Sequence, residues 1–371
     1  MDSMTLVLVL LSVLVAVVGI FVAATPYFQR KGELFAVTLP VEALDSAEIA
    51  SMKKRYALIM AAVAVLSLII CLFFALTGAS AAFFAAFVFL TLFETVIGFG
   101  LMLLFRRKAL ALKSERGWET NPAQASAVVC EDGSIVPRGV SIWWNLLHLP
   151  IIAVTIAIIA AAYPSMPDMV PTYIGFDGVV DGWTQKGLGF FALPVSIEVL
   201  LAACMAFSHY MLLRSKRWTD PGAPVTTAWA YGCYLRANTA VLVVTGLLLN
   251  AVLGIGMALS FIGIISLPEM TVVVVFVTVI LCVASVAVSV YFGQAGSRLL
   301  KRVENVSGAS EDDACWKLGV FYWNPDDASA VLPKRFGFGW TPNWARPVVW
   351  AWVVGFALLT VLFVVLCFAF A

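Results

Sequence analysis

Long apolar stretches alternate with shorter polar ones along the whole chain. Eight of these stretches are long enough to cross about 30 Å of hydrocarbon, which takes about 20 residues of helix. They lie at residues 4–24, 56–77, 81–105, 146–163, 190–213, 239–265, 271–296 and 348–370. The pattern therefore predicts an all-α polytopic membrane protein with about eight transmembrane helices.

The composition indicates the same class of protein. Hydrophobic residues make up 62% of the 371 residues and charged residues only 12%, whereas an ordinary soluble domain carries about 25% charged residues. A soluble fold of this size could not bury so much apolar surface, so we expect the lipid bilayer to be its solvent. The 23 basic and 22 acidic residues nearly cancel, so the overall charge does not indicate any partner. We expect no direct contact with nucleic acid.

The positions of lysine and arginine predict the orientation in the membrane. No basic residue precedes the first apolar stretch, whereas Arg30 and Lys31 follow it. This order argues against a cleavable signal peptide and favours an outside amino terminus. Alternation then gives inside segments at 25–55, 106–145, 214–238 and 297–347. These segments hold every basic residue except Lys186, so we expect both termini on the outside.

Three of the inside segments carry strand signals. Residues 33–40 form a short apolar run, and 126–138 contain an Asp-Gly turn between two β-rich arms. A further hairpin is predicted from residues 317–323 paired with 330–336. Because an isolated hairpin is only marginally stable in water, we expect these pieces to combine in one small cytoplasmic β cap, with its carboxy-terminal module at 307–346.

One external connection, residues 164–189, has room for structure of its own. We expect a short extracytoplasmic hairpin that turns at Asp177-Gly178, where glycine supplies the positive φ. Its aromatic and charged side chains are predicted to contact an apolar or cationic ligand. The candidate residues are Tyr173, Asp177, Asp181, Trp183 and Lys186. The alternative is a lid that closes the helix bundle, with Trp183 resting at the membrane interface.

The sequence of this loop resembles a widespread bacterial membrane domain of unknown function that occurs in SdpI-like toxin-immunity proteins. The positions that match the family pattern are Pro171, Gly178, Asp181, Trp183 and Lys186. Tyr173 stands where the family usually has histidine, so a metal or proton role of that histidine is not expected here. Residues 30–56 also resemble the first inside loop of these proteins.

The carboxy-terminal segment resembles a second unassigned module that often accompanies the first. The matching residues are Trp316, Lys317, Gly319, Phe321, Tyr322, Asn324, Pro325, Val331, Lys334, Arg335, Gly337, Gly339, Trp340 and Asn343. The resemblance implies a bacterial cytoplasmic membrane protein that gives immunity to a secreted peptide toxin at its outer face. It also implies that a cytosolic regulator is held at the inner cap. The candidate contacts there are Trp316, Lys317, Tyr322, Trp323, Lys334, Arg335 and Trp340.

Glu94, Glu198 and Asn250 fall well inside the apolar stretches. A charged group in mid-bilayer costs about 2.5–3.5 kcal/mol, so we expect Glu94 and Glu198 to face a cavity or a partner. They are either stations for a proton or cation in a transporter or protonated structural acids. Asn250 is expected to hydrogen-bond between helices.

The common sequence signatures of catalysis are missing from the chain. His148 and His209 are its only histidines, and we expect them at the inner interface with their polar tips toward water. Two histidines without a third ligand do not make a metal site. We therefore expect no enzymatic activity, no cofactor and no metal. The remaining hypotheses are an immunity or signal-sensing protein, a proton- or cation-coupled transporter, and a structural companion of another membrane protein, each with membrane lipids as partners.

Overall fold

A computed structural model describes residues 3–118, 136–175, 179–187, 189–217, 219–220, 222–300 and 312–370. Within these ranges, eight helices are long and apolar enough to cross a membrane, which confirms the predicted all-α polytopic class. They are α1 (Ser3–Ala24), α2 (Ala47–Leu76), α3 (Ser80–Glu115), α4 (His148–Ala162), α5 (Gly189–Leu213), α6 (Pro224–Phe261), α7 (Leu267–Phe292) and α8 (Pro347–Phe370).

Three of these helices are longer than the apolar stretches predicted. Helices α2, α3 and α6 have 30, 36 and 38 residues. At 1.5 Å per residue, the longest two span roughly 55 Å, whereas the hydrocarbon is about 30 Å thick. Each of the three continues past its apolar stretch at the end where the basic residues lie. The polar ends of these helices therefore extend beyond the apolar stretches and pack near the small strands.

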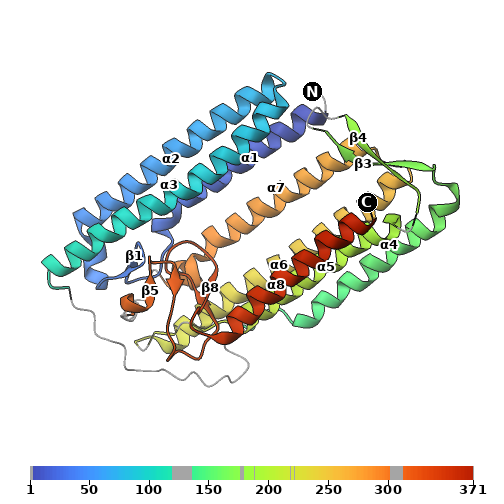
Figure 1. Ribbon diagram of the computed structural model, residues 1–371. Coiled ribbons are helices and arrows are strands. Elements are labelled where there is room, and N and C mark those ends of the chain that lie inside the picture. The colour runs from blue at the N-terminus through green and yellow to red at the C-terminus, as the bar shows by residue number, and fades with distance from the viewer. Residues whose placement is uncertain are drawn as a thin grey trace.

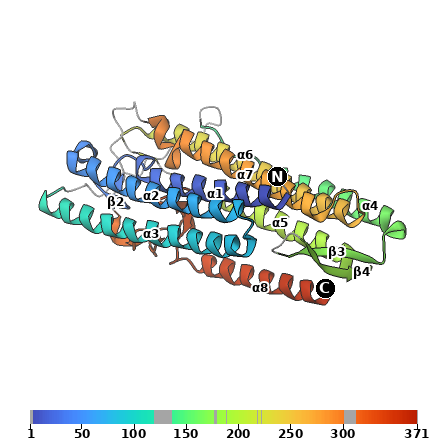
Figure 2. The same cartoon turned by 90° about the horizontal axis from the view of Figure 1, so that it is seen from above.

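The helices form two groups. Helix α1 packs against α2 and α3, while α4, α5 and α6 pack against one another and α8 lies against α5. Helix α7 contacts both α1 and α6 and so joins the groups (Figure 1). Seen from above, α6 and α7 form one side of the bundle and α3 and α8 the other (Figure 2).

The two ends of the bundle differ. Both termini lie at one end, together with the antiparallel strands β3 (Met169–Ile174) and β4 (Val180–Gln185) (Figure 1). We call this the hairpin end. The pairing of β3 with β4 confirms the predicted hairpin. The expected turn at Asp177-Gly178 lies outside the described residues. The opposite end, which we call the cap end, carries the remaining strands (Figure 1).

Among the described residues, the cap contains three antiparallel pairs of very short strands. They are β1 (Glu33–Leu34) with β2 (Val37–Thr38), β5 (Trp316–Lys317) with β6 (Phe321–Tyr322), and β7 (Val331–Pro333) with β8 (Trp340–Pro342). The predicted pairing of 317–323 with 330–336 is therefore wrong. Leu318 and Gly319 both have positive φ, so the chain turns back after two residues and β5 pairs with β6 instead.

Short 3-10 helices and packing contacts complete the cap and the connections. The 3-10 helices are η1 (Thr25–Tyr27), η2 (Val41–Asp45), η3 (Ile142–Leu147), η4 (Tyr163–Ser165), η5 (Gln294–Leu300) and η6 (Asp313–Cys315). Phe35, in the turn of β1–β2, stacks on Phe336 with ring centres 5.9 Å apart. This contact joins the first loop of the chain to its last module. The hairpin expected within 126–138 falls almost entirely outside the described residues.

Candidate functional site

The β3–β4 hairpin has one buried and one exposed face. Val170 is fully buried in a hydrophobic cluster with Ile159 of α4 and Phe261 of α6. Strand alternation turns the neighbouring side chains away from the bundle, and Trp183 is 54% exposed. We call this surface the outer face; it consists of Met169, Asp181, Trp183 and Gln185. An aromatic ring, a thioether and a carboxylate are thus presented together at the hairpin end.

Lys186 fastens the hairpin to the end of α4. Its Nζ donates a hydrogen bond to the carbonyl of Met166 at 3.1 Å and lies 4.8 Å from the centre of the Tyr163 ring. Its backbone N–H also donates to Asp168 O at 2.8 Å. Lys186 therefore contacts its own chain. Of the five residues predicted to contact a ligand, the structure brings Asp181 and Trp183 together on the outer face.

The two remaining residues predicted to contact a ligand are Tyr173 and Asp177. The backbone of Tyr173 pairs with Gly182 across the two strands. Asp177 lies outside the described residues. Their roles stay predictions.

Below the hairpin, a row of buried polar side chains runs along the contact between α4, α5 and α6. We call it the polar seam; it consists of the buried Glu198, Thr155, His148, Asn250, His209 and Thr239, together with the partly buried Asn145 of η3. Glu198 lies deepest toward the hairpin end, and Thr155 Oγ1 donates a 2.9 Å hydrogen bond to its Oε1. A Cβ built on Gly254 of α6 would lie 1.9 Å from the same oxygen, so only glycine leaves room for this carboxylate.

The next contacts of the seam, toward the cap, each pair a histidine with an asparagine. Asn250 Nδ2 lies 2.9 Å from His148 Nδ1, and Asn145 Nδ2 lies 2.9 Å from His209 Nδ1. His209 Nε2 is 3.0 Å from the carbonyl oxygen of Val140. Both histidines are buried, so the prediction that their tips point toward water is wrong. The expected role of Asn250 between helices is confirmed.

Several polar atoms of the seam keep unused hydrogen-bonding capacity. Glu198 Oε2, His148 Nε2, Asn250 Oδ1 and Asn145 Oδ1 are buried without a hydrogen-bond partner among the described residues. Buried polar groups are usually satisfied by protein or by ordered water. These four atoms are therefore the positions of the seam that ordered water would satisfy.

Glu94 lies in the other group of helices. It is buried, and its Oε2 would lie 3.0 Å from a Cβ on Gly19 of α1. Its Oε1 has no hydrogen-bond partner in the part of the chain that the structure describes. Helix α3, which carries Glu94, packs against α1 and α2, whereas α5, which carries Glu198, packs against α4, α6 and α8. The two acids thus belong to separate seams.

At the cap end, Arg335 is the centre of a buried cluster of charges. Its side chain is 1% exposed, and its guanidinium contacts the carboxylates of Asp312 and Asp313. The Nε of Arg335 lies 3.5 Å from Oε1 of Glu33, which is itself paired with Arg30. The cluster therefore connects the first loop with the carboxy-terminal module.

Asp313 extends this cluster to α3. Its carboxylate accepts hydrogen bonds from the backbone N–H of Thr38 at 3.1 Å and from the hydroxyl of Thr38 at 3.0 Å. The Nζ of Lys113, near the end of α3, lies 3.2 Å from Oδ2 of Asp313. Strand β2, helix α3 and the carboxy-terminal module are thus held by one carboxylate.

Gln294 joins the cap to the group of helices that forms the polar seam. Its Nε2 donates to the carbonyls of Lys334 at 3.0 Å and Gly339 at 2.8 Å. Its Oε1 accepts from Gly339 N at 3.2 Å and from the Tyr234 hydroxyl of α6 at 3.3 Å. Sequence reasoning missed this residue. The available signal was a glutamine directly after Gly293, where the apolar stretch gives way to a turn.

The seven predicted partner contacts of the cap divide by exposure. Trp316, Tyr322 and Arg335 are buried within the cap, so they hold the cap together. Lys334 is partly buried, and Trp340 packs its ring 5.3 Å from that of Tyr234. The exposed surface near β5 and β6 is formed by Lys317, Leu318, Phe321 and Trp323.

A carboxylate and a phenol beside this surface have shifted pKa values. Burial acts to raise the pKa of Asp327, but hydrogen bonds from Lys216 and Ser329 outweigh it and lower the pKa below its usual value. Burial raises the pKa of Tyr322, whose hydroxyl donates to Asp327 Oδ2 at 3.0 Å. At neutral pH, a charged carboxylate therefore accepts from a neutral phenol.

Two parts of the chain match known family models. Residues 150–197 match a domain of unknown function, DUF1648, and residues 325–350 match a family of unknown function, DUF5808. The first match covers most of α4, the hairpin and the start of α5, and the second covers β7, β8 and the start of α8. With eight candidate membrane spans, the matches fit a membrane protein family of unknown function. No curated protein and no solved structure matches the chain.

Proposed function

We propose that this membrane protein senses a ligand at the outer face of its hairpin and transmits the change to a cytosolic regulator held at the cap. One observation carries the proposal. The two helices that bear the hairpin, α4 and α5, are joined to α6 by the polar seam, and α6 is bonded to the cap through Tyr234 and Gln294. A continuous series of specific contacts thus connects the two ends.

The outer face supports a peptide as the ligand. Trp183 and Met169 offer exposed aromatic and thioether surface, and Asp181 adds a negative charge beside them. This combination suits an amphipathic cationic peptide, because cations are attracted both to carboxylates and to aromatic faces. Together with the resemblance to SdpI-like proteins, it supports immunity to a secreted peptide toxin in a bacterial cytoplasmic membrane.

Motion at the hairpin would reach α4 first. Lys186 binds the hairpin to Met166 and Tyr163 at the end of that helix. A shift of α4 would change the contacts of Thr155 with Glu198 and of His148 with Asn250. Such a response requires that the ligand bind one arrangement of the helices more tightly than another.

The cap offers the complementary surface for a regulator. Leu318, Phe321 and Trp323 are exposed apolar side chains next to Lys317. Aromatic residues of this kind are enriched among the residues that dominate protein–protein binding. The regulator would therefore dock on the exposed edge of β5 and β6.

The test uses the purified full-length chain and a synthetic amphipathic peptide of lysine and leucine. Hydrogen exchange of residues 316–343 is measured with and without the peptide, for the unmodified chain, for Trp183→Ala and for Ile264→Ala. Ile264 is a matched control because it is also exposed and apolar and lies in the connection from α6 to α7. We expect the peptide to change exchange in the unmodified chain and in Ile264→Ala but not in Trp183→Ala. If the peptide leaves the hydrogen exchange of residues 316–343 unchanged in the unmodified chain, the proposal is contradicted.

A second candidate function is proton- or cation-coupled transport. It is favoured by the buried carboxylates of Glu198 and Glu94, each with one oxygen that has no partner among the described residues. Because the acids belong to separate seams, each is tested alone. Proton flux into liposomes that contain the full chain is compared for Glu198→Gln, Glu94→Gln and the unmodified chain. Loss of flux in either variant supports transport, and absence of flux in the unmodified chain argues against it.

A further inference from the structure

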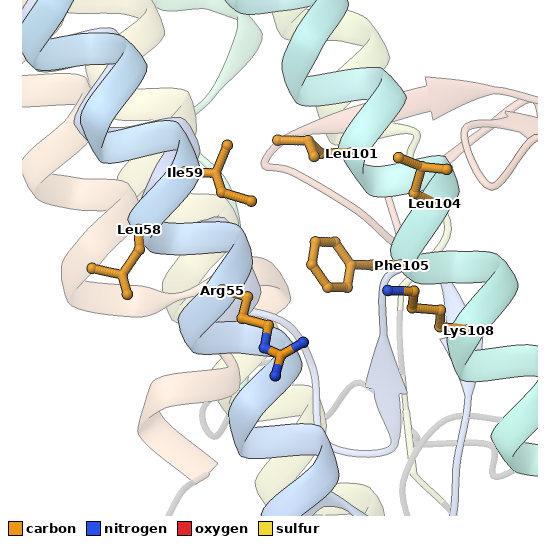
Figure 3. A pocket seen from close by; sticks show the side chains of 7 residues that line it. All are labelled: Arg55, Leu58, Ile59, Leu101, Leu104, Phe105 and Lys108. Atoms are coloured by element: carbon orange, nitrogen blue, oxygen red, sulfur yellow. The ribbon is translucent and has the colours of Figure 1, made fainter.

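A groove between α2 and α3 opens on the surface of the bundle near the cap end (Figure 3). Its volume is about 420 Å³, within the range of about 300–1,000 Å³ that is usual for small-molecule sites. The groove is lined by Arg55, Leu58, Ile59, Leu101, Leu104, Phe105 and Lys108. Five of the seven side chains are apolar and the other two are basic.

The apolar and basic side chains lie at opposite ends of the groove. Figure 3 shows Arg55 of α2 and Lys108 of α3 at one end, with Ile59 and Leu101 toward the other and Phe105 between the helices. Phe105 is buried and forms the floor of the groove. The site therefore pairs a cationic end with an apolar channel.

The depth of each end matches the layers of a bilayer. Leu58 follows Arg55 by three residues and Leu101 precedes Lys108 by seven, which at 1.5 Å per residue places them about 5 and 10 Å further along the helices. Both directions lead from the cap end into the apolar stretches. The basic end thus lies at the level of lipid headgroups and the apolar channel at the level of acyl chains.

The two cations of the groove, Arg55 and Lys108, have no ion pair with the described part of the chain. Neither Arg55 nor Lys108 has an acidic partner within ion-pairing distance in the part of the chain that the structure describes. Neighbouring basic residues of α3 are used otherwise: Arg106 donates to the carbonyl of Ala36, and Arg116 pairs with Glu48 at 2.7 Å. Lys108 Nζ instead lies 5.6 Å from the centre of the Phe105 ring. No acidic side chain among the described residues neutralises this end, which leaves it open to an added anion.

We propose that the groove binds one anionic glycerophospholipid from the leaflet at the cap end. The phosphate lies between the Arg55 guanidinium and the Lys108 ammonium, and one acyl chain lies along Leu58, Ile59, Leu101 and Leu104. A membrane lipid fits better than a soluble phosphate, because Leu58 is 60% and Leu104 is 54% exposed on helices that face hydrocarbon. Basic pockets between membrane helices are a known setting for lipid headgroups.

The site also lies next to the core of the cap. Phe105 stacks on Phe35 of the β1–β2 turn, with ring centres 5.1 Å apart. A lipid that packs against Phe105 would therefore contact both α2 and α3 next to the β1–β2 turn of the cap.

The first experiment measures lipid retention by native mass spectrometry of the full chain in detergent. Phosphatidylglycerol, phosphatidylcholine and inorganic phosphate are added separately. The double variant Arg55→Gln/Lys108→Gln is compared with Lys54→Gln/Arg107→Gln, which removes the same charge from the exposed neighbours on the same helices. We expect phosphatidylglycerol to be retained over phosphatidylcholine, and the groove variant to lose about tenfold or more in affinity while the control keeps it.

The second experiment tests the apolar channel without changing charge. Leu104→Trp fills the groove, whereas Val96→Trp adds the same ring at an exposed position of α3 outside it. We expect Leu104→Trp alone to weaken phosphatidylglycerol binding. If it has no effect while Arg55→Gln/Lys108→Gln weakens lipid and inorganic phosphate alike, the site is for a free anion. If Lys54→Gln/Arg107→Gln weakens lipid equally, only the general surface charge is involved. Either result overturns the proposal, and equal melting temperatures show that all variants are folded.

Discussion

The carboxylate of Glu198 occupies the space that a side chain on Gly254 would need. The two residues belong to α5 and α6, and a Cβ on Gly254 would lie 1.9 Å from Oε1 and 2.1 Å from Cδ of the acid. Real Cβ atoms do not approach other atoms so closely. The close approach of α6 at this level therefore depends on glycine, and it is what encloses the acid completely.

Replacing Gly254 with alanine should displace the Glu198 side chain and loosen the seam. We expect Gly254→Ala to lower the free energy of unfolding by about 1–3 kcal/mol, the usual cost of overpacking. Gly256→Ala is the control, because its Cβ would lie at an ordinary 3.5 Å from Met270. Thermal unfolding of both variants in detergent checks this. Equal melting temperatures would show that the carboxylate moves aside freely.

Removing the buried guanidinium of Arg335 should detach the carboxy-terminal module from the first loop. Glu33 and Arg335 are 0% and 1% exposed, and breaking one half of a buried ion pair costs about 3–5 kcal/mol. We expect Arg335→Met to speed hydrogen exchange across residues 316–343 by several orders of magnitude. Lys216→Met is the control, since Lys216 is 50% exposed in its pair with Asp327 and such pairs contribute about 0–1 kcal/mol. Similar exchange in the two variants would contradict this account of the cap.

Gly319 should tolerate alanine less well than Gly337 does. Both have positive φ, at 73° and 85°, so alanine carries the same backbone penalty of about 1 kcal/mol at each. A Cβ on Gly319 would in addition lie 3.0 Å from Ala36 Cβ and 3.2 Å from Arg106 Cδ, whereas Gly337 has nothing within 4 Å. The melting temperature of Gly319→Ala should be the lower of the two. The reverse order would mean that the β1–β2 turn yields easily.

The cap should lose stability in acid through Asp327. Its pKa is lowered in the folded protein from a usual value of 3.8, so the charged form is favoured by folding. That contribution is present above the usual value and disappears as the pH falls through the lowered one. The protection factors of residues 316–343, which are the ratios of intrinsic to observed exchange rate at each pH, should therefore fall below about pH 4, and Asp327→Asn should weaken this dependence. An unchanged acid response in Asp327→Asn would assign it to other carboxylates.

The membrane spans could be predicted because a run of about 20 apolar residues is itself the physical requirement for crossing the bilayer. The helices that continue beyond the apolar stretches could not be placed in the same way. In α3, the residues from Arg106 to Glu115 are largely good helix formers, and the helix ends only before Gly117, which has φ of 60°. Helical propensity, and not hydropathy, sets that boundary.

The strand pairing of the cap was predicted wrongly because the predicted strand 317–323 includes the turn at Leu318 and Gly319, which both have positive φ. Contacts with the first loop of the chain also hold this module. Gln29 donates to the carbonyl of Arg335 at 3.1 Å, and Asp313 binds Thr38. Local turn signals within 316–343 contain no information about residues near 30. The histidine–asparagine pairs could have been predicted from the sequence, because a buried polar group in a membrane must find a hydrogen-bond partner. Asn250 and His148 were both candidates for such pairing.

The contact between Glu33 and Arg335 also sets an order for biosynthesis. Glu33 leaves the ribosome long before Arg335, so during most of synthesis its carboxylate has Arg30 but not Arg335 as a partner. The Phe35–Ala36 turn has φ of 46° and 61°. Its stacking contact with Phe336 also forms only after the last module has been synthesised. A truncated product that stops before residue 312 would therefore lack the contacts that Arg335 and Phe336 make with Glu33 and Phe35.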